Sequence, residues 1–114
     1  MNGNDIVIVS ATRTAIGKFG GQFATTSAIE LGTAVAKSAI QKAKLSPDQI
    51  DTVIFGNVLQ AGLGQNPARQ VGLQAGLLHS STALTVNEVC GSGLKAIILA
   101  AQSLRLGDAK IVLA

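Results

Sequence analysis

Short apolar runs rich in β-branched residues alternate with longer stretches of helical periodicity, and this alternation most limits the possible fold. The runs occupy residues 6–9, 52–55, 82–89 and 110–114. Continuous apolar runs of this kind are typical of strands buried on both faces, which occur in parallel sheets covered by helices. We therefore predict an α/β fold in the order β-α-β-α-β-α-β, with a largely parallel mixed sheet and helices on both of its faces.

The first expected helix follows residue 26 and ends near Lys44. Ser27 and Glu30 have the spacing of a capping box, in which each side chain binds a free backbone N–H group of the other residue. Its expected apolar face repeats at helical spacing, at Leu31, Val35, Ala39 and Ala43.

Two further helices are expected later in the chain. The second covers residues 66–77, where Gly72 and Gly76 weaken the helix and suggest close packing against another backbone. The third covers residues 91–106 and is closed by Gly107. Because its apolar residues go almost all the way round, we expect the third helix to be buried.

The composition excludes several classes of function. Only 13% of the residues are charged, which indicates that either a partner subunit or a second half of the protein covers part of the surface. The net charge of +3 includes no basic run, and three phenylalanines offer no stacking platform, so we expect no nucleic-acid binding. One cysteine, Cys90, and one histidine, His79, build neither a disulfide nor a metal site. With no secretory signal and no run of about 20 apolar residues, a cytoplasmic protein without membrane attachment is expected.

Cys90 has the most informative position for chemistry. It lies between a predicted strand and the glycine-framed start of the third helix. The helix dipole and the free N–H groups there favour a thiolate, which is the nucleophilic form of cysteine. Gly91 and Gly93 allow a substrate carbonyl to approach the backbone, and their N–H groups are candidates for stabilising an oxyanion. The alternative is that Cys90 is a small buried apolar residue.

Four segments together resemble the thiolases. Residues 13–19, 55–62, 65–70 and 89–93 are similar to thiolase sequence blocks, in the same order and spacing, and the resemblance extends from about residue 5 to residue 114. It is closest to acetoacetyl-CoA thiolases. The resemblance implies that Cys90 accepts an acetyl group as a thioester, and that two acetyl-CoA molecules condense to acetoacetyl-CoA and CoA, or the reverse. The substrates would be coenzyme A thioesters, and no cofactor would be needed.

The resemblance also implies a domain organisation. Residues 1–114 would form an incomplete amino-terminal domain of the thiolase fold, without the carboxy-terminal domain and the CoA-binding loop domain. The catalytic histidine and the second cysteine of the family would then be missing, and His79 is expected to be a loop histidine. The full-length form would be a homodimer or homotetramer. Asn66, Arg69 and Glu88 are candidates for supporting an interface or the catalytic loop.

Two other functions fit parts of the sequence. A chain without the proton-transfer groups would not turn over, and would act only as a folding or assembly unit. Gly91, Gly93 and Ala96 also fit the dinucleotide-binding fingerprint G-x-G-x-x-A. This last alternative lacks the acidic residue that should follow the next strand, since Asp108 precedes that strand. Reaction direction and acyl-chain preference do not follow from these residues.

Overall fold

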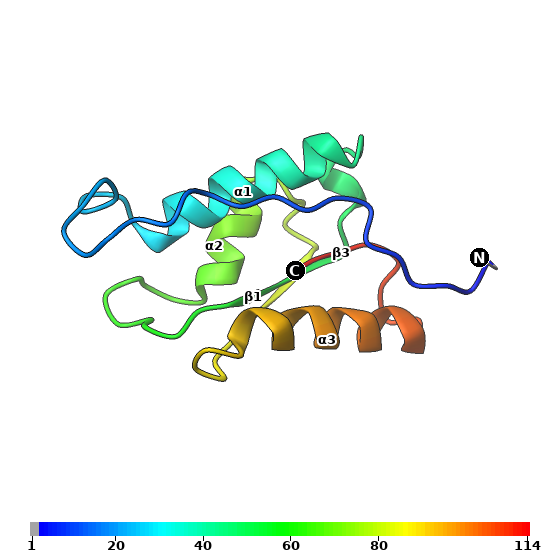
Figure 1. Cartoon of the computed structure of the whole chain (residues 1–114). Helices are drawn as coiled ribbons and strands as arrows, with labels where there is room; N and C mark the ends of the chain where they lie inside the picture. Colours follow the sequence, from blue (N-terminus) through cyan, green and yellow to red (C-terminus); the bar gives the residue numbers. More distant parts are fainter. Residues whose placement is uncertain (1–2) are drawn as a thin grey trace.

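The computed structural model describes residues 3–114 and shows three layers, with a parallel sheet between helices (Figure 1). The central strand β1 (Thr52–Gly56) pairs in parallel with β2 (Thr82–Val86) on one side and with β3 (Val112–Leu113) on the other. Helices α1 (Ala28–Lys42) and α2 (Pro67–Gln74) lie on one face, and α3 (Ser92–Leu106) lies on the opposite face. The predicted α/β class with a parallel sheet is confirmed.

Two apolar clusters hold the layers together, and β1 contributes to both. Val53, which is 1% exposed, packs with residues of α1 and α2, whereas the next residue, Ile54, packs with Ala96 and Ala100 of α3. Neighbouring side chains in a strand point to opposite faces, so a strand covered on both sides needs apolar residues at consecutive positions. The continuous apolar run of residues 52–55 therefore has a direct structural cause.

Helix α1 starts at the predicted capping box. The Glu30 carboxylate accepts a hydrogen bond from the Ser27 N–H at 2.7 Å, and the Ser27 hydroxyl accepts one from the Glu30 N–H at 3.1 Å. The bond from the Ser27 backbone, followed by its hydroxyl, lowers the pKa of Glu30. The prediction of the apolar face is wrong, because the face of Leu31, Val35, Ala39 and Ala43 is not the buried one. The residues that the helix buries are Ile29, Thr33, Ala36 and Ile40.

The cause of this shift is that α1 has two adjacent apolar stripes. Leu31 and Val35, on the predicted stripe, are only half-buried and line a cavity of about 270 Å³ beside Phe55. At 3.6 residues per turn the centres of the two stripes lie roughly 110° apart, so they form adjacent faces of the helix. The sequence pattern does not say which of them is buried, since the position of α2, against which α1 packs, decides it.

The predicted first strand is not formed. Residues 6–9 are extended but belong to no ladder, and the side chain of Ile8 is 76% exposed. Contacts with α1 begin after this segment, where the Ser10 hydroxyl donates to the Ala39 carbonyl at 2.8 Å, and the chain then runs along that helix (Figure 1). A β-branched run becomes a strand only where a neighbouring strand supplies partners for its backbone groups. Among residues 3–114, no such partner lies next to this run.

Helix α2 is shorter than predicted, since it ends at Gln74. Gly72 lies inside it, and a Cβ there would be 3.0 Å from Val53 Cγ1, so the helix packs closely at this point, although against a side chain and not against another backbone. Gly76 lies outside the helix with φ +97°, a left-handed conformation that favours glycine. The expected close packing is therefore found at Gly72, with side chains in place of a backbone, and the prediction that Gly76 lies inside the helix is wrong. The third predicted strand is also shorter, and ends at Val86.

Helix α3 ends at Gly107 as predicted, with φ +82° at that residue, but it is not buried all round. Its buried residues are Ser92, Ala96 and Ala100, whereas Leu94 is 66% exposed. One helix touches one sheet along a single stripe, so the apolar residues on its other sides remain uncovered. Val89–Leu106 is also apolar enough to pass a test for a membrane span, with 18 residues and a mean hydropathy of 1.2, a test that core helices of soluble proteins also pass.

Candidate active site

Cys90 lies in a tight turn between the end of β2 and the start of α3. β2 ends at Val86 and α3 begins at Ser92, so residues 87–91 must reverse direction within a few bonds. Cys90 is the only cysteine in the chain, and its side chain is exposed. The alternative that Cys90 is a small buried apolar residue is therefore wrong for this structure.

The residue before Cys90 has an unfavourable backbone conformation. Val89 has φ 51°, in the left-handed region that β-branched residues rarely adopt. Such a residue costs about 1–3 kcal/mol and persists only where its surroundings hold it in place. Since Val89 is 64% exposed, packing of its own side chain does not supply that support. The support must come from hydrogen bonds of the turn.

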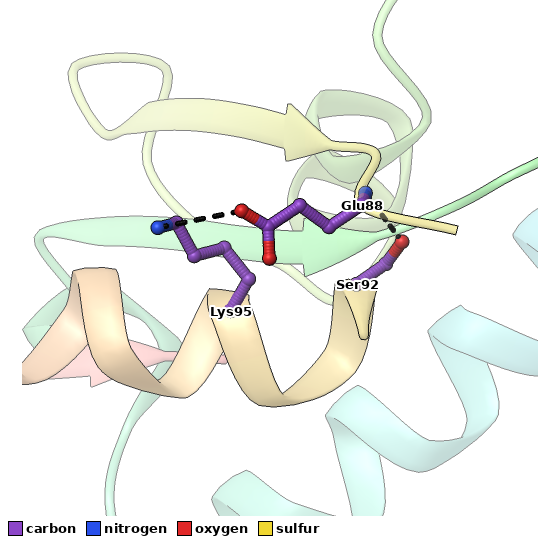
Figure 2. A network of polar contacts seen from close by, with 3 residues as sticks. All are labelled: Glu88, Ser92 and Lys95. Atoms are coloured by element: carbon purple, nitrogen blue, oxygen red, sulfur yellow. Dashed lines mark hydrogen bonds and ion pairs between the residues drawn. The ribbon is translucent and has the colours of Figure 1, made fainter. Parts of the chain in front are cut away.

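Ser92 supplies two of those hydrogen bonds, and Figure 2 shows the one with the Glu88 N–H. Its hydroxyl accepts a bond from the Glu88 N–H at 2.9 Å and donates one to the Val89 carbonyl at 2.6 Å. Ser92 is 4% exposed, so both bonds are shielded from water. The Asn87 carboxamide adds a third, accepting from the Val89 N–H at 2.9 Å. Side-chain hydrogen bonds thus hold the Glu88 N–H, the Val89 N–H and the Val89 carbonyl, all in the two residues before Cys90.

Gly56, at the end of β1, permits α3 to begin where it does. A Cβ at Gly56 would lie 2.5 Å from the Ser92 carbonyl carbon and 2.7 Å from both Ser92 Cβ and the Ser92 carbonyl oxygen. Any larger residue would therefore displace the first turn of α3. Gly56 fixes the height of the Cys90 turn above the sheet, whereas Ser92 fixes its shape.

Glu88 lies on the same turn, but its side chain is directed along α3 (Figure 2). Its carboxylate lies 3.5 Å from Lys95 Nζ, and the two side chains are 56% and 38% exposed. An ion pair this open to solvent contributes at most about 1 kcal/mol. The prediction that Glu88 supports the catalytic loop stays a prediction, and this ion pair is the only polar contact of its carboxylate in the structure of residues 3–114.

The two glycines predicted to stabilise an oxyanion differ in their surroundings. The Gly91 N–H donates to the Glu88 carbonyl at 3.0 Å, so it is already engaged. A Cβ at Gly93 would meet nothing within 4 Å. Gly93 lines an open depression of about 280 Å³, together with Phe55, Gly56, Ala96, Ile97 and Ala114. Of the two, Gly93 leaves more room for a substrate.

Asn66 and Arg69 lie at the start of α2, and their polar contacts go elsewhere than to the Cys90 turn. Asn66 has φ 42°, and its carboxamide oxygen accepts bonds from the Arg69 N–H and the Thr85 hydroxyl. The Arg69 guanidinium donates to the Ser81 carbonyl at 2.7 Å and to the His79 carbonyl at 2.9 Å. Both residues hold α2 against β2 and the loop before it. His79 is exposed in that loop, as expected.

Sequence reasoning did not single out Ser92, Gly56 or the conformation of Val89. A serine at a helix start and a glycine after a strand are common features that carry no specific signal. The role of each residue depends on the distance between α3 and β1, which is a tertiary property. Ser92 and Gly56 contact each other only because the sheet brings them together across 36 residues of sequence.

Comparison with known proteins identifies the family. Residues 6–114 match the family described as thiolase, N-terminal domain. The chain belongs to this family. This thiolase domain is 58% identical over 108 residues to an acetyl-CoA acetyltransferase of Escherichia coli (strain K12), which covers 95% of the chain and 27% of that relative. It is also 59% identical over 114 residues to one from Allochromatium vinosum, covering 100% of the chain and 29% of the relative.

A cytosolic acetyl-CoA acetyltransferase of Mus musculus is 52% identical over 109 residues, covering 96% of the chain and 28% of that relative. The thiolase domain thus spans less than a third of the length of these relatives. The family match favours the thiolase interpretation of Gly91, Gly93 and Ala96 over the dinucleotide fingerprint. In the structure, Ala96 is 1% exposed and packs against Ile54 of β1.

Proposed function

We propose that this thiolase domain supplies the nucleophile of an acetyl-CoA acetyltransferase, with Cys90 as the residue that carries the acetyl group. The observation that supports the proposal is the placement of an exposed thiol on a strained, hydrogen-bonded turn at the start of α3. Backbone strain of this kind is often found at functional sites. The N-terminus of a helix also favours negative charge, which a thiolate carries.

The first half of the reaction transfers the acetyl group. The Cys90 sulfur attacks the carbonyl carbon of acetyl-CoA, a new S–C bond forms, and the bond between that carbon and the CoA sulfur breaks. CoA leaves as a thiolate and takes up a proton. Covalent catalysis of this type divides one difficult transfer into two easier steps.

The second half joins the two acetyl units. A second acetyl-CoA loses a proton from its methyl carbon, and that carbon attacks the acetyl group on Cys90. The S–C bond to Cys90 breaks, which releases acetoacetyl-CoA and returns the thiol. The resemblance to thiolases assigns this proton transfer to a histidine and a second cysteine of a carboxy-terminal domain. The same steps in reverse cleave acetoacetyl-CoA.

The proposal includes a setting for the protein. Coenzyme A thioesters are the substrates and no further cofactor takes part. We also propose a homo-oligomer in the cytoplasm. The low proportion of charged residues, 13%, supports association. The name of the mouse relative supports the location, because that protein is described as cytosolic.

Intact-mass spectrometry after exposure to acetyl-CoA tests the proposal. We expect the 114-residue chain to gain one acetyl group, and neutral hydroxylamine to remove it, since hydroxylamine cleaves thioesters but leaves acetylated lysines. Cys90→Ser is the matched control. Because Cys90 is exposed, this substitution leaves the fold intact and should abolish the adduct. An unmodified chain, or equal labelling of Cys90→Ser, would count against Cys90 as the acetyl carrier.

A second candidate function is that of a folding or assembly unit without turnover. The exposed apolar side of α3 favours it, since Leu94, Ile97 and Ile98 are 66%, 45% and 42% exposed. Contiguous exposed apolar patches often mark interaction surfaces. Light scattering over a concentration series separates the two. Association without acetylation would support the assembly unit, whereas acetylation of a monomer would support the acyl carrier.

A further inference from the structure

We propose that Ser92 is a positioning residue for Cys90, acting through the two peptide units that precede the thiol. This inference rests on the proposed function, since it explains how the chain holds its acetyl carrier. Ser92 does not itself bond to Cys90. Its hydroxyl joins the Glu88 N–H and the Val89 carbonyl, which lie on either side of the strained residue.

The Ser92 hydroxyl makes two hydrogen bonds that the methyl group of an alanine cannot make. Ser92 is 4% exposed, and its hydroxyl both accepts at 2.9 Å and donates at 2.6 Å. A buried polar group that loses its partner is strongly unfavourable, so an alanine would leave the Glu88 N–H without a partner. The turn could recover water contacts for that group only by opening. Opening would move Val89 out of its left-handed conformation.

The conformation of Val89 determines where Cys90 points. With φ 51° at Val89, the chain reverses just before Cys90 and continues directly into α3. If Val89 relaxed to the extended region, the thiol would leave the helix start. The start of a helix favours negative charge, and this effect decays within the first turn, so displacing residue 90 from the start of α3 should lower the reactivity of its thiol.

Other bonds in the turn do not replace Ser92. The Ser92 N–H also donates to the Val89 carbonyl at 3.1 Å, and the Gly91 N–H donates to the Glu88 carbonyl at 3.0 Å. No substitution of Ser92 removes the donor or acceptor groups of these backbone bonds. These bonds occupy only the carbonyl groups of Glu88 and Val89. The Glu88 N–H depends on the Ser92 hydroxyl.

The test measures the reactivity of Cys90 toward iodoacetamide, a small electrophile that needs no CoA pocket. We expect the second-order rate constant to fall roughly two- to fivefold in Ser92→Ala, which is the loss that follows from removing a helix-dipole interaction. Ser92→Thr retains the hydroxyl and should react at nearly the wild-type rate. Val89→Gly in the Ser92→Ala background should restore part of the rate, because glycine adopts a positive φ without the help of the hydroxyl.

A destabilised control variant distinguishes the positioning role of Ser92 from a general loss of stability. Val71→Ala removes buried apolar volume on the other side of the sheet, where Val71 is 2% exposed. It should lower the unfolding temperature and leave the alkylation rate unchanged. If Ser92→Ala reacted as fast as wild type, or if Val71→Ala slowed alkylation equally, the positioning role would be refuted.

The two proposals fail separately. Loss of alkylation rate in Ser92→Ala without any acetylation of the wild-type chain would retain the positioning role and refute the acetyl carrier. Acetylation of the wild type with equal alkylation rates in both chains would do the opposite. Should Ser92→Thr fail to fit beside Gly56, the Val89→Gly rescue decides the question, since Val89 is exposed and tolerates substitution.

Discussion

Replacing Gly56 with alanine tests the packing that sets the height of the Cys90 turn. The added Cβ would lie 2.5 Å from the carbonyl carbon of Ser92, whereas ordinary contacts begin at 3.4 Å. The nearest atoms include the backbone of α3, which cannot rotate away as a flexible side chain would. The helix and β1 must therefore separate by roughly 1 Å at this point.

The expected cost follows from two opposing effects. Overpacking of a fitted interface costs about 1–3 kcal/mol. Alanine also reduces the freedom of the unfolded chain, which offsets about 0.4–1 kcal/mol. We therefore expect Gly56→Ala to lower the free energy of unfolding by about 1–2 kcal/mol. In a domain of this size, the midpoint of thermal unfolding should fall by about 5–10 °C.

Gly93→Ala is the matched control, because the same substitution meets nothing within 4 Å there. Gly93 lies inside α3, where alanine favours the helix by up to about 1 kcal/mol. Circular dichroism during urea and thermal unfolding should show opposite shifts for the two variants. Equal stabilisation by both would refute the packing argument, since it would show that α3 moves away from Gly56 at no cost.

Two further predictions concern residues that hold elements in place. The Asp51 carboxylate accepts bonds from the backbone N–H groups of Lys110 and Ile111, which lower its pKa, so its stabilising effect is complete above about pH 4 and disappears as the pH falls through the lowered value. Asp51→Asn should therefore be less stable than wild type at pH 7 in urea unfolding, with a difference that shrinks below pH 4; a difference independent of pH would contradict this. Asn66→Ala should cost about 2 kcal/mol, because it removes the cap of α2 at a residue with φ 42°. Asn66→Gly, which tolerates that φ, should cost less, and equal losses would show that backbone conformation is not the cause.

The sequence predicted those features whose causes are local. The capping box of Ser27 and Glu30 depends on a spacing of three residues, and Gly107 ends α3 because glycine adopts a left-handed conformation easily. The buried strand β1 followed from consecutive apolar residues. The thiolase resemblance also came from sequence, since four blocks in a fixed order are informative before any coordinates exist, and it directed attention to Cys90.

Tertiary structure decided everything that depends on which surfaces meet. Residues 6–9 have the composition of a strand, yet they form none in residues 3–114, because no neighbouring strand supplies backbone partners there. Helix α3 is apolar all round, but only the stripe that includes Ala96 touches the sheet. Ser92 and Gly56 gained their roles when β1 and α3 approached each other. Local bonding can be predicted from a few neighbouring residues, whereas a close contact between distant residues exists only after the chain has folded.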